Sequence, residues 1–287
     1  MEGYIITVFG SLNVDYIFQV PQLPAPGETV LASNMQVLPG GKGANQAVAA
    51  ARAGAKVRMV GAVGRDGLSE IALAGLLDAG VDTSAVAQST KPTGTAAINV
   101  DAQGENAITV SSGANLDARG DSLDEKNLTP RTTVLLQMEV PMTAMADLVQ
   151  RAHRKEACIV WNLAPMQSVD LALLKQVDCL IVNEGELNQL HSEFHQTREP
   201  NNDSTKDVEQ KAWDIFTLTR QSVVVTLGAN GTLAIHNNTL LTVPALAISP
   251  VDTVGAGDAF TGAFTAALDR GETFPVALRW GNVAGGL

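Results

Sequence analysis

The sequence contains few cysteines, few aromatic residues and no long apolar run. Its two cysteines, Cys158 and Cys179, each lie inside a short apolar stretch, which favours small buried hydrophobic positions over a disulfide or a metal site. No apolar run approaches the roughly 18 residues that cross a membrane, and the N-terminus lacks the basic and apolar regions of a secretory signal. We therefore expect no membrane partner and a cytoplasmic location.

Positive charge is also scarce, because 19 Lys and Arg residues stand against 30 Asp and Glu residues and give a formal net charge of -11. This balance disfavours non-specific binding to nucleic acid, and an anionic substrate would need a local binding device. The 287 residues, 26 of them glycine, are enough for a large core with tight turns. One large α/β domain, or one domain with a smaller appendage, accounts for this length.

Short apolar runs alternate with segments of helical periodicity. The runs predict strands at Ile5–Phe9, Val57–Val63, Thr133–Met138, Cys158–Trp161, Cys179–Val182 and Ser222–Leu227. The periodic segments predict helices at Ala44–Ala53, Leu68–Ala79, Met142–Ala152, Leu171–Val177 and Val208–Leu218. The alternation predicts parallel βαβ units and a doubly wound α/β sheet.

Residues 14–38 and 95–110 break this alternation. The first segment carries three prolines between extended stretches, and the second reads as a hairpin with its turn at 101–104. We predict that they pair into a small second sheet that acts as a lid or an interface; edge strands of the main sheet are the alternative. The polar segment 192–207 is predicted to be a mobile surface loop. His191 and His195 have i, i+4 spacing, but no carboxylate-rich pattern lies near them in sequence, so a metal site is not favoured.

Polar residues recur where the predicted strands end. They are Asn13, Asp15, Glu139, Asn162, Asn183, Glu186 and Thr226, with Gly228. In open α/β sheets ligands bind beyond the carboxyl ends of the strands, so we predict that these residues face one crevice. For any one of them alone, helix capping or turn formation is an equally good explanation.

The segment Gly40-Gly41-Lys42-Gly43-Ala44-Asn45-Gln46 leads into a helix of small residues. Its glycines would let the backbone approach a ligand closely, and Lys42 and Asn45 supply donors for hydroxyl groups. The Walker A pattern fails on both sides of Lys42, and the dinucleotide pattern fails at Gln46. A tight turn before a closely packed helix would need the same glycines.

A second small-residue segment, Gly255-Ala256-Gly257-Asp258, opens another predicted helix. The unpaired amides of its first turn make an anion site with positive dipole character. Asp258 in that turn would act as a general base beside the anion site, or it would only stabilise the helix dipole.

Taken together, these segments resemble the phosphofructokinase-B-type, or ribokinase-like, sugar kinases. The resemblance rests on Gly40 to Asn45, on Asn183-Glu184-Gly185-Glu186 and on Asp252 to Asp258, and it covers essentially the whole chain. It implies a single domain over residues 1–287, with a three-layer, doubly wound, mainly parallel sheet and a small β lid at about 14–38 and 95–110. It also implies ATP-dependent transfer of phosphate to the 5-hydroxyl of D-ribose, with ribose and ATP as partners and a homodimer formed through the lid.

The resemblance assigns roles residue by residue. Asp258 is the implied base, with the anion hole at Gly255, Ala256 and Gly257, and the implied sugar ligands are Asn13, Asp15, Gly41, Lys42, Asn45, Glu139 and Asp258. The implied nucleotide site comprises Asn183, Thr226, Gly228, Gly231, Gly257 and Asn282. Glu186 is expected to hold Mg²⁺ through water, and Asp252 and the Val254 carbonyl are expected to bind an activating K⁺.

The family pattern normally continues past the helix that ends near Leu287, into a loop that completes the cation site and a terminal helix. We therefore expect the K⁺ site and part of the nucleotide pocket to be incomplete in this chain. Two other functions stay open: a kinase of deoxyribose, a fructose derivative or a nucleoside, and a non-catalytic sugar-binding regulator. The retained Asp258 and its anion site argue against the regulator.

Overall fold

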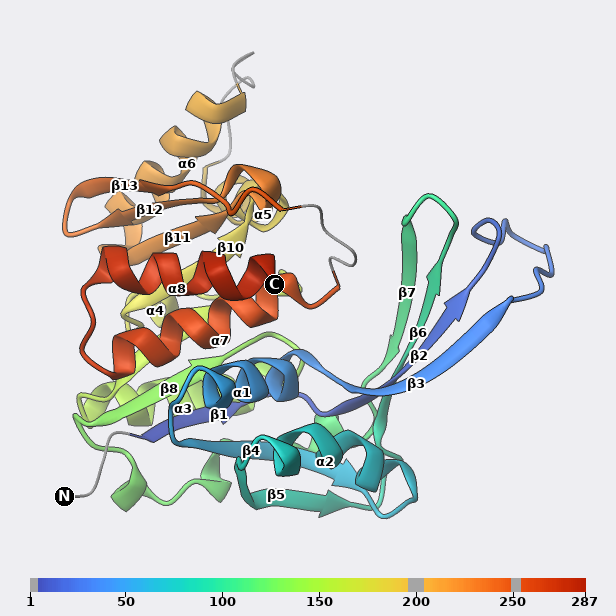
Figure 1. The fold of residues 1–287 in the computed structure, drawn as a ribbon. Coiled ribbons are helices and arrows are strands. Elements are labelled where there is room, and N and C mark those ends of the chain that lie inside the picture. Colours follow the sequence, from blue (N-terminus) through green and yellow to red (C-terminus); the bar gives the residue numbers. More distant parts are fainter. Residues whose placement is uncertain (1–4, 196–203, 249–253) are drawn as a thin grey trace.

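The computed structural model describes residues 5–195, 204–248 and 254–287. Its main sheet has the strand order β13-β12-β11-β10-β9-β8-β1-β4-β5 (Figure 1). All neighbouring strands from β5 to β11 run parallel, and β12 and β13 add an antiparallel hairpin at one edge. The strands are β1 Ile5–Phe9, β4 Val57–Gly64, β5 Asp82–Ser89, β8 Thr132–Leu136, β9 Cys158–Asn162, β10 Cys179–Asn183, β11 Ser222–Thr226, β12 Thr232–His236 and β13 Thr239–Val243.

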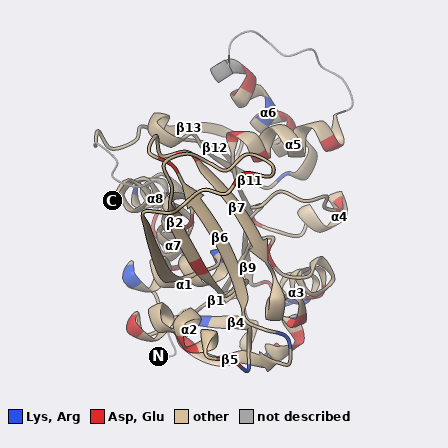
Figure 2. Ribbon diagram, turned by 90° about the vertical axis from the view of Figure 1, so that its right-hand side faces the viewer, with Lys and Arg blue, Asp and Glu red and all other residues tan. Residues whose placement is uncertain are grey.

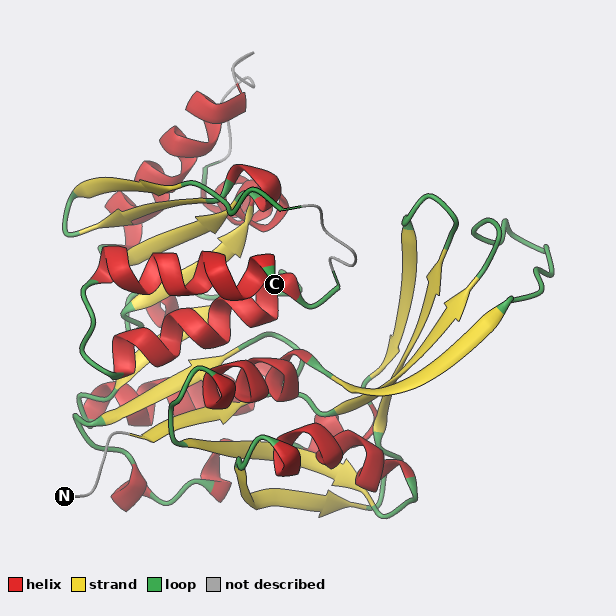
Figure 3. Ribbon diagram, in the orientation of Figure 1, coloured by secondary structure: helices red, strands yellow, loops and turns green. Residues whose placement is uncertain are grey.

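Helices cover both faces of this sheet and make three layers (Figure 3). One face packs against α1 Lys42–Arg52, α2 Leu68–Asp78, α7 Ala256–Asp269 and α8 Phe274–Gly286. The other packs against α3 Met142–Arg154, α4 Leu171–Leu174, α5 Glu184–Phe194 and α6 Ser204–Thr219. Successive strand residues point to opposite faces, so Val8 joins the first core and Phe9 the second. The predicted doubly wound α/β fold is confirmed.

The second sheet is separate from the main one and stands off its carboxyl edge (Figure 1). It consists of β2 Asn13–Gln19, β3 Asn34–Gly40, β6 Gly94–Val100 and β7 Asn106–Ser111, in the order β3-β2-β6-β7. These strands fall in the two segments for which a second sheet is predicted, and they are not edge strands of the main sheet. Asp15 is the one charged residue in the four strands, whose ribbons are otherwise uncoloured in Figure 2.

Three strands of the main sheet, β5, β12 and β13, were not predicted from the sequence. β5 mixes polar and apolar residues because it forms the outer edge of the sheet and is only partly buried. β12 and β13 are joined by Asn237 and Asn238, both with positive φ, as a two-residue hairpin turn requires. Asn-Asn between two apolar runs was a usable signal for this hairpin.

The prediction of a loop over 192–207 is wrong at both ends, because α5 continues to Phe194 and α6 begins at Ser204. α6 has polar residues on the side that faces α5, where Lys211 pairs with Asp207 four residues earlier and also donates to Asn188 of α5. Residues 196–203 lie outside the described part of the chain.

The helix predicted to reach Val177 ends at Leu174. Four short 3₁₀ helices complete the described elements: Gly113–Asp117, Gly120–Ser122, Glu125–Asn127 and Gly228–Asn230.

Both cysteines are free, as expected. Cys179 is buried and Cys158 is half-buried, and burial raises the pKa of the Cys158 thiol to about 12. None of the helices described in the structure is long and apolar enough to cross a membrane.

Candidate active site

The glycine turn before α1 lies directly against the base of the lid. Gly41 caps α1 with φ 89°, and a Cβ there would come within 2.9 Å of Asn13 N and Ser11 O. A Cβ on Gly40 would come within 2.2 Å of all three carboxyl atoms of Asp15. Both glycines are therefore required for the backbone to approach so closely, and the turn places Lys42 at the carboxyl edge of the main sheet.

Two of the predicted sugar ligands are held by hydrogen bonds across the start of the lid. The Oδ1 atom of the buried Asn13 accepts a hydrogen bond from Asn115 Nδ2 at 2.7 Å. Glu139 Oε2 accepts hydrogen bonds from Ser11 Oγ at 2.5 Å and from the backbone N–H of Lys42 at 3.0 Å. Asn115 and Ser11 were not predicted as site residues, and they orient residues that were.

Asp15 differs from its neighbours because its buried Oδ1 has no hydrogen-bond partner. Burial raises its pKa to about 6; the negative charges of Glu139 and Asp258 add to this shift, and Lys42 opposes it. A buried carboxylate oxygen without a donor is costly in the free protein. Asp15 is therefore suited to accept a hydrogen bond from a ligand hydroxyl.

Asp258 lies in the first turn of α7, after Gly255, which caps the helix in the left-handed conformation at φ 79°. Its side chain is buried, with Oδ1 accepting a hydrogen bond from Gln46 Nε2 at 2.9 Å and Oδ2 one from Asn45 Nδ2 at 3.2 Å. Burial raises the pKa of Asp258, whereas the positive charge of Lys42 and the two amides oppose that rise. The first-turn amides of α7 have no partner within the helix, so the carboxylate stands beside an anion-binding helix terminus.

A chain of amides lies behind Asp258, and of its members the sequence analysis singled out Asn162 but not Gln46 or Gln137. Gln46 Nε2 also donates to Asn162 Oδ1 at 2.9 Å, and Gln46 Oε1 accepts from Gln137 Nε2 at 2.7 Å. All three amide side chains are buried between the main sheet and α1. The signal was present, because Gln46 is a polar residue on a helix face whose other buried residues are all glycine or alanine.

A cavity of about 110 Å³ joins several strand ends to the start of α7. It is lined by Lys42, Asn162, Asn183, Glu186, Thr226, Gly255, Gly257 and Asp258, among others. The prediction that polar residues at strand ends face one crevice is confirmed for Asn162, Asn183, Glu186 and Thr226. Ala256, between the two glycines, faces the neighbouring cavity.

Asn183 and Glu186 form a reciprocal capping box at the start of α5. Asn183 Oδ1 accepts from the backbone N–H of Glu186, and Glu186 Oε2 accepts from the backbone N–H of Asn183, each at 2.8 Å. Burial raises the pKa of Glu186, and the hydrogen bond from Asn183 opposes this shift. The amide oxygen of Asn183 and one carboxylate oxygen of Glu186 are thus used in the helix cap, while both residues still line the cavity.

A second cavity, of about 510 Å³, adjoins the first and shares Thr226 and Gly257 with it. Gly228, Gly231 and Asn282 line it, together with the apolar side chains of Leu246, Ile248 and Phe260. Asn282 donates from Nδ2 to the carbonyl oxygens of Val243 and Pro244, at 3.0 and 3.1 Å, and accepts from Thr232 Oγ1 at 2.5 Å. Its amide therefore holds the wall of this cavity in place. The mixture of apolar wall and glycine backbone suits a flat heterocycle attached to a polar group.

Of the two predicted K⁺ ligands, the structure describes only Val254, because Asp252 lies outside the described residues. Val254 is 44% exposed and lines neither of the two cavities.

Comparison with known proteins agrees with this arrangement. The model of the pfkB family carbohydrate kinases matches residues 5–287. The chain is 34% identical to a ribokinase of Haemophilus influenzae over 283 residues, which are 97% of this chain and 90% of that protein. It is 32% identical to a deoxyribokinase of Salmonella typhi over 263 residues, which are 90% and 84% of the two proteins.

Solved structures give the same result. A ribokinase of Thermotoga maritima superposes with a TM-score of 0.88 at 32% identity, covering 99% of this chain and 92% of that one. The Arabidopsis thaliana ribokinase complexed with ribose and ATP superposes with a TM-score of 0.86 at 29% identity, covering 99% and 92%. This chain belongs to the pfkB family of carbohydrate kinases.

Proposed function

We propose that this protein transfers the γ-phosphoryl group of ATP to the 5-hydroxyl of D-ribose, giving ribose 5-phosphate and ADP. The observation that carries the proposal is the position of Asp258, a buried carboxylate in the first turn of α7 whose cavity is also lined by Lys42, Gly255 and Gly257. The ribokinases among its relatives support the choice of ribose. The deoxyribokinase relative makes 2-deoxyribose the second candidate.

The sugar is proposed to lie between the lid and α1. Asn13, Asp15 and Glu139 offer acceptors, while Lys42, Asn45 and the Gly41 backbone offer donors, which suits a ligand with several hydroxyl groups. The unpartnered Oδ1 of Asp15 is the strongest indication of a missing hydroxyl donor.

Asp258 acts as the general base in this proposal. Its carboxylate takes the proton of the 5-hydroxyl as the sugar oxygen attacks the γ-phosphorus, and the bond to the β,γ-bridging oxygen breaks to release ADP. The amides from Gly255 to Asp258 stabilise charge on the phosphoryl oxygens during the transfer. Asn45 and Gln46 hold the carboxylate in position for this step.

The nucleotide is proposed to occupy the larger cavity, with its phosphates directed toward the smaller one through the shared residues Thr226 and Gly257. Asn183, Gly228 and Gly231 would contact the phosphates and ribose of ATP. Asn282 would shape the wall beside the adenine, since its own polar atoms are bonded to Val243, Pro244 and Thr232.

Glu186 is the proposed residue for Mg²⁺, directly or through water. Its carboxylate is half-buried in the cavity that contains Asp258, and oxygen ligands of this kind are those that Mg²⁺ prefers. When bound, Mg²⁺ neutralises charge on the β- and γ-phosphates. Activation by K⁺ rests on Asp252 and Val254, of which only Val254 is described.

The lid is proposed to cover the sugar and to form a homodimer. Strand pairing places Leu38, Ile108 and Val110 on the same face as Asp15, and these three apolar side chains are 43%, 53% and 47% exposed. A partner lid would cover this face.

The use of ATP and the two free cysteines favour a cytoplasmic location.

A coupled assay of ADP release with Mg-ATP and K⁺ tests the proposal, using D-ribose, 2-deoxyribose, fructose and adenosine as acceptors. We expect D-ribose to have the highest kcat/KM and the product to carry phosphate on C5. A kcat/KM about tenfold higher for another acceptor would reassign the substrate within the family. No ADP release with any acceptor would leave the non-catalytic regulator as the better reading.

A further inference from the structure

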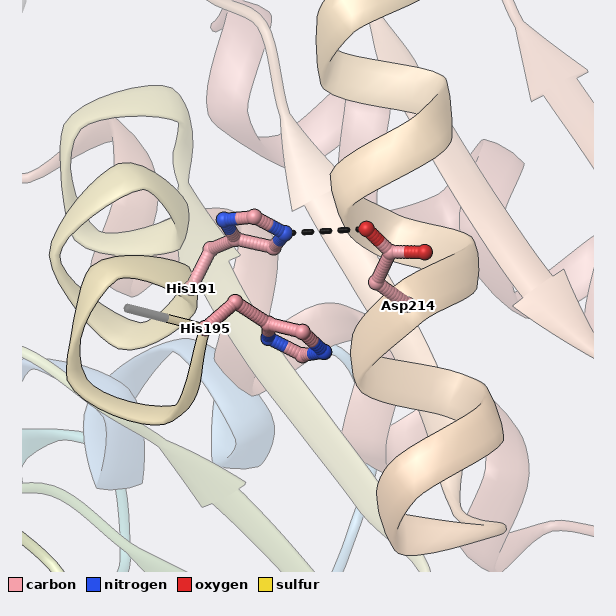
Figure 4. A group of neighbouring side chains, drawn as sticks. All are labelled: His191, His195 and Asp214. Atoms are coloured by element: carbon pink, nitrogen blue, oxygen red, sulfur yellow. Dashed lines mark hydrogen bonds and ion pairs between the residues drawn. The ribbon is translucent and has the colours of Figure 1, made fainter. Parts of the chain in front are cut away.

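Two histidines at the end of α5 face a carboxylate on α6, on the sheet face opposite α1 and α7 (Figure 4). The sequence shows no carboxylate-rich pattern near His191 and His195, so a metal site was not favoured there, but the fold brings Asp214 beside them. One ligand atom from each of the three side chains lies within 4.8 Å of the others. His191 is eight residues after Asn183, so the cluster lies about 12 Å along the helix from the candidate active site.

The polar groups of this cluster are only partly satisfied. His191 Nε2 and Asp214 Oδ2 are 2.9 Å apart and share a proton. The ring of His195 stacks on that of His191, with centroids 4.4 Å apart and planes at 9°, and its Nδ1 is buried without a hydrogen-bond partner. The cluster thus sets two imidazoles, the buried His191 and the half-buried His195, beside one carboxylate, and leaves one ring nitrogen of His195 without a hydrogen bond.

The donor set has the chemistry of a transition-metal site. Two histidines four residues apart along a helix are a known arrangement for zinc. Here His191 lies in α5, His195 directly follows its last residue, and Asp214 completes a three-residue ligand set. The carboxylate of Asp214 is also held on the side away from His191, because its Oδ1 accepts a hydrogen bond from Gln210 Nε2 at 3.0 Å. Such outer hydrogen bonds fix metal-ligating carboxylates in position.

We propose that His191, His195 and Asp214 bind a divalent ion of the zinc type, with water as the fourth ligand. The ion replaces the proton between His191 Nε2 and Asp214 and joins α5 to α6. Metal–ligand bonds of about 2.0–2.2 Å place tetrahedral ligand atoms about 3.3–3.6 Å apart. The His195 nitrogen must therefore move closer to the other two ligand atoms, while His191 Nε2 and Asp214 Oδ2, now 2.9 Å apart, separate slightly. Rotation of the His195 ring about χ2, a broad torsion, breaks the ring stack and supplies this movement. The site is separate from the proposed kinase reaction.

Titration with Co²⁺, a coloured substitute for Zn²⁺, tests the proposal on the full chain without nucleotide. Millimolar Mg²⁺ is present throughout, so that the oxygen ligands of the candidate active site are occupied. We expect one Co²⁺ per chain with the intense visible absorption of tetrahedral coordination, lost on addition of Zn²⁺. His195→Ala and Asp214→Asn should each weaken binding by more than about tenfold. Asp214→Asn keeps the shape of the side chain, so weaker Co²⁺ binding in this variant would not be explained by a folding defect.

His153→Ala is the matched control, because this exposed histidine of α3 contacts the Gln176 carbonyl and the charge of Asp178 and does not belong to the cluster. It should bind Co²⁺ as the unmodified protein does. Zn²⁺ should also raise the Tm of the unmodified protein and of His153→Ala, but not that of His195→Ala. Absence of the visible absorption, or equal Co²⁺ affinity in the unmodified protein and both cluster variants, would overturn the site and leave a His–Asp pair that only links two helices.

Discussion

The two sides of the candidate site are built in different ways. On the body side, both carboxylate oxygens of Asp258 accept hydrogen bonds from side-chain amides, and one of these amides, that of Gln46, belongs to a buried network. On the lid side, Asp15 has a buried oxygen without a partner and is the one charge on its sheet. Asp258 on the body is thus held by hydrogen bonds within the protein, whereas Asp15 on the lid has a carboxylate oxygen available to a ligand.

Packing explains this difference. α1 and α7 approach so closely that a Cβ on Gly262 would come within 2.5 Å of Gln46 O. The lid strands have apolar side chains that are about half exposed, such as Met35 and Ile108. A side chain on the body is therefore fixed before substrate arrives, and one on the lid becomes fixed by binding.

The largest effect is expected from Asp258→Asn. The substitution keeps the size of the side chain but removes the proton acceptor, so kcat should fall by about 10²- to 10⁴-fold with much less change in sugar affinity. Steady-state kinetics with ribose and Mg-ATP would measure this. If kcat stays within about threefold of the parent value, Asp258 only stabilises the helix and the assignment of the base is wrong.

Asp15→Asn should act on binding instead of turnover. Loss of a charged acceptor should raise KM for ribose by about tenfold or more, with kcat little changed. The Tm of the free protein near neutral pH should not fall, because the carboxylate that is removed is buried and partly unpaired. A lower Tm with an unchanged KM would instead make Asp15 a structural residue of the lid.

Gly262→Ala tests the tight packing behind Asp258. The added methyl group would come within 2.6 Å of Ala49 Cβ and 2.8 Å of Ala50 N, so we expect a loss of about 1–3 kcal/mol in the free energy of unfolding. Gly67→Ala is the control, since Gly67 has φ −68° and nothing within 4 Å of its added Cβ. Urea unfolding of both variants would give the comparison, and equal stability would contradict the crowding of α1 against α7.

The pH dependence should separate the two carboxylates. The raised pKa of Asp15, about 6, means that kcat/KM should fall below about pH 6, and the raised pKa of Asp258 adds to this acid limb. In Asp15→Asn the acid limb of kcat/KM should be less steep. For stability the sign is opposite: protonated Asp15 favours the free folded protein, so its contribution is lost as pH rises through about 6. An unchanged acid limb in Asp15→Asn would remove Asp15 from the sugar site.

The smallest effect on turnover is expected from Ile108→Asp at the edge strand of the lid. A buried charge at a lid interface should convert a homodimer to a monomer, which light scattering at micromolar concentration would detect. Leu77→Asp is the control, because Leu77 is 60% exposed on α2, away from the lid face that carries Asp15. A monomeric parent protein would remove the dimer from the proposal but leave the lid.

The course of the chain could largely be predicted from the sequence. Alternating apolar runs and helical segments are local patterns, and so are the glycines before α1 and α7 and the polar residues at strand ends. Failures came where a segment is stabilised mainly by its neighbours: edge strand β5, hairpin β12–β13 and the polar ends of α5 and α6. At such positions tertiary packing outweighs local preference.

Spacings along the chain are enough to predict the α/β class, the second sheet and the candidate base. Which side chains meet depends on the tertiary structure. It placed Gln46 and Asn45 on the oxygens of Asp258, left an oxygen of Asp15 without a partner, and brought Asp214 to His191 and His195. The physical reason is that hydrogen bonds and desolvation depend on distances between residues that are far apart in sequence, and these distances are set when the helices pack on the sheet.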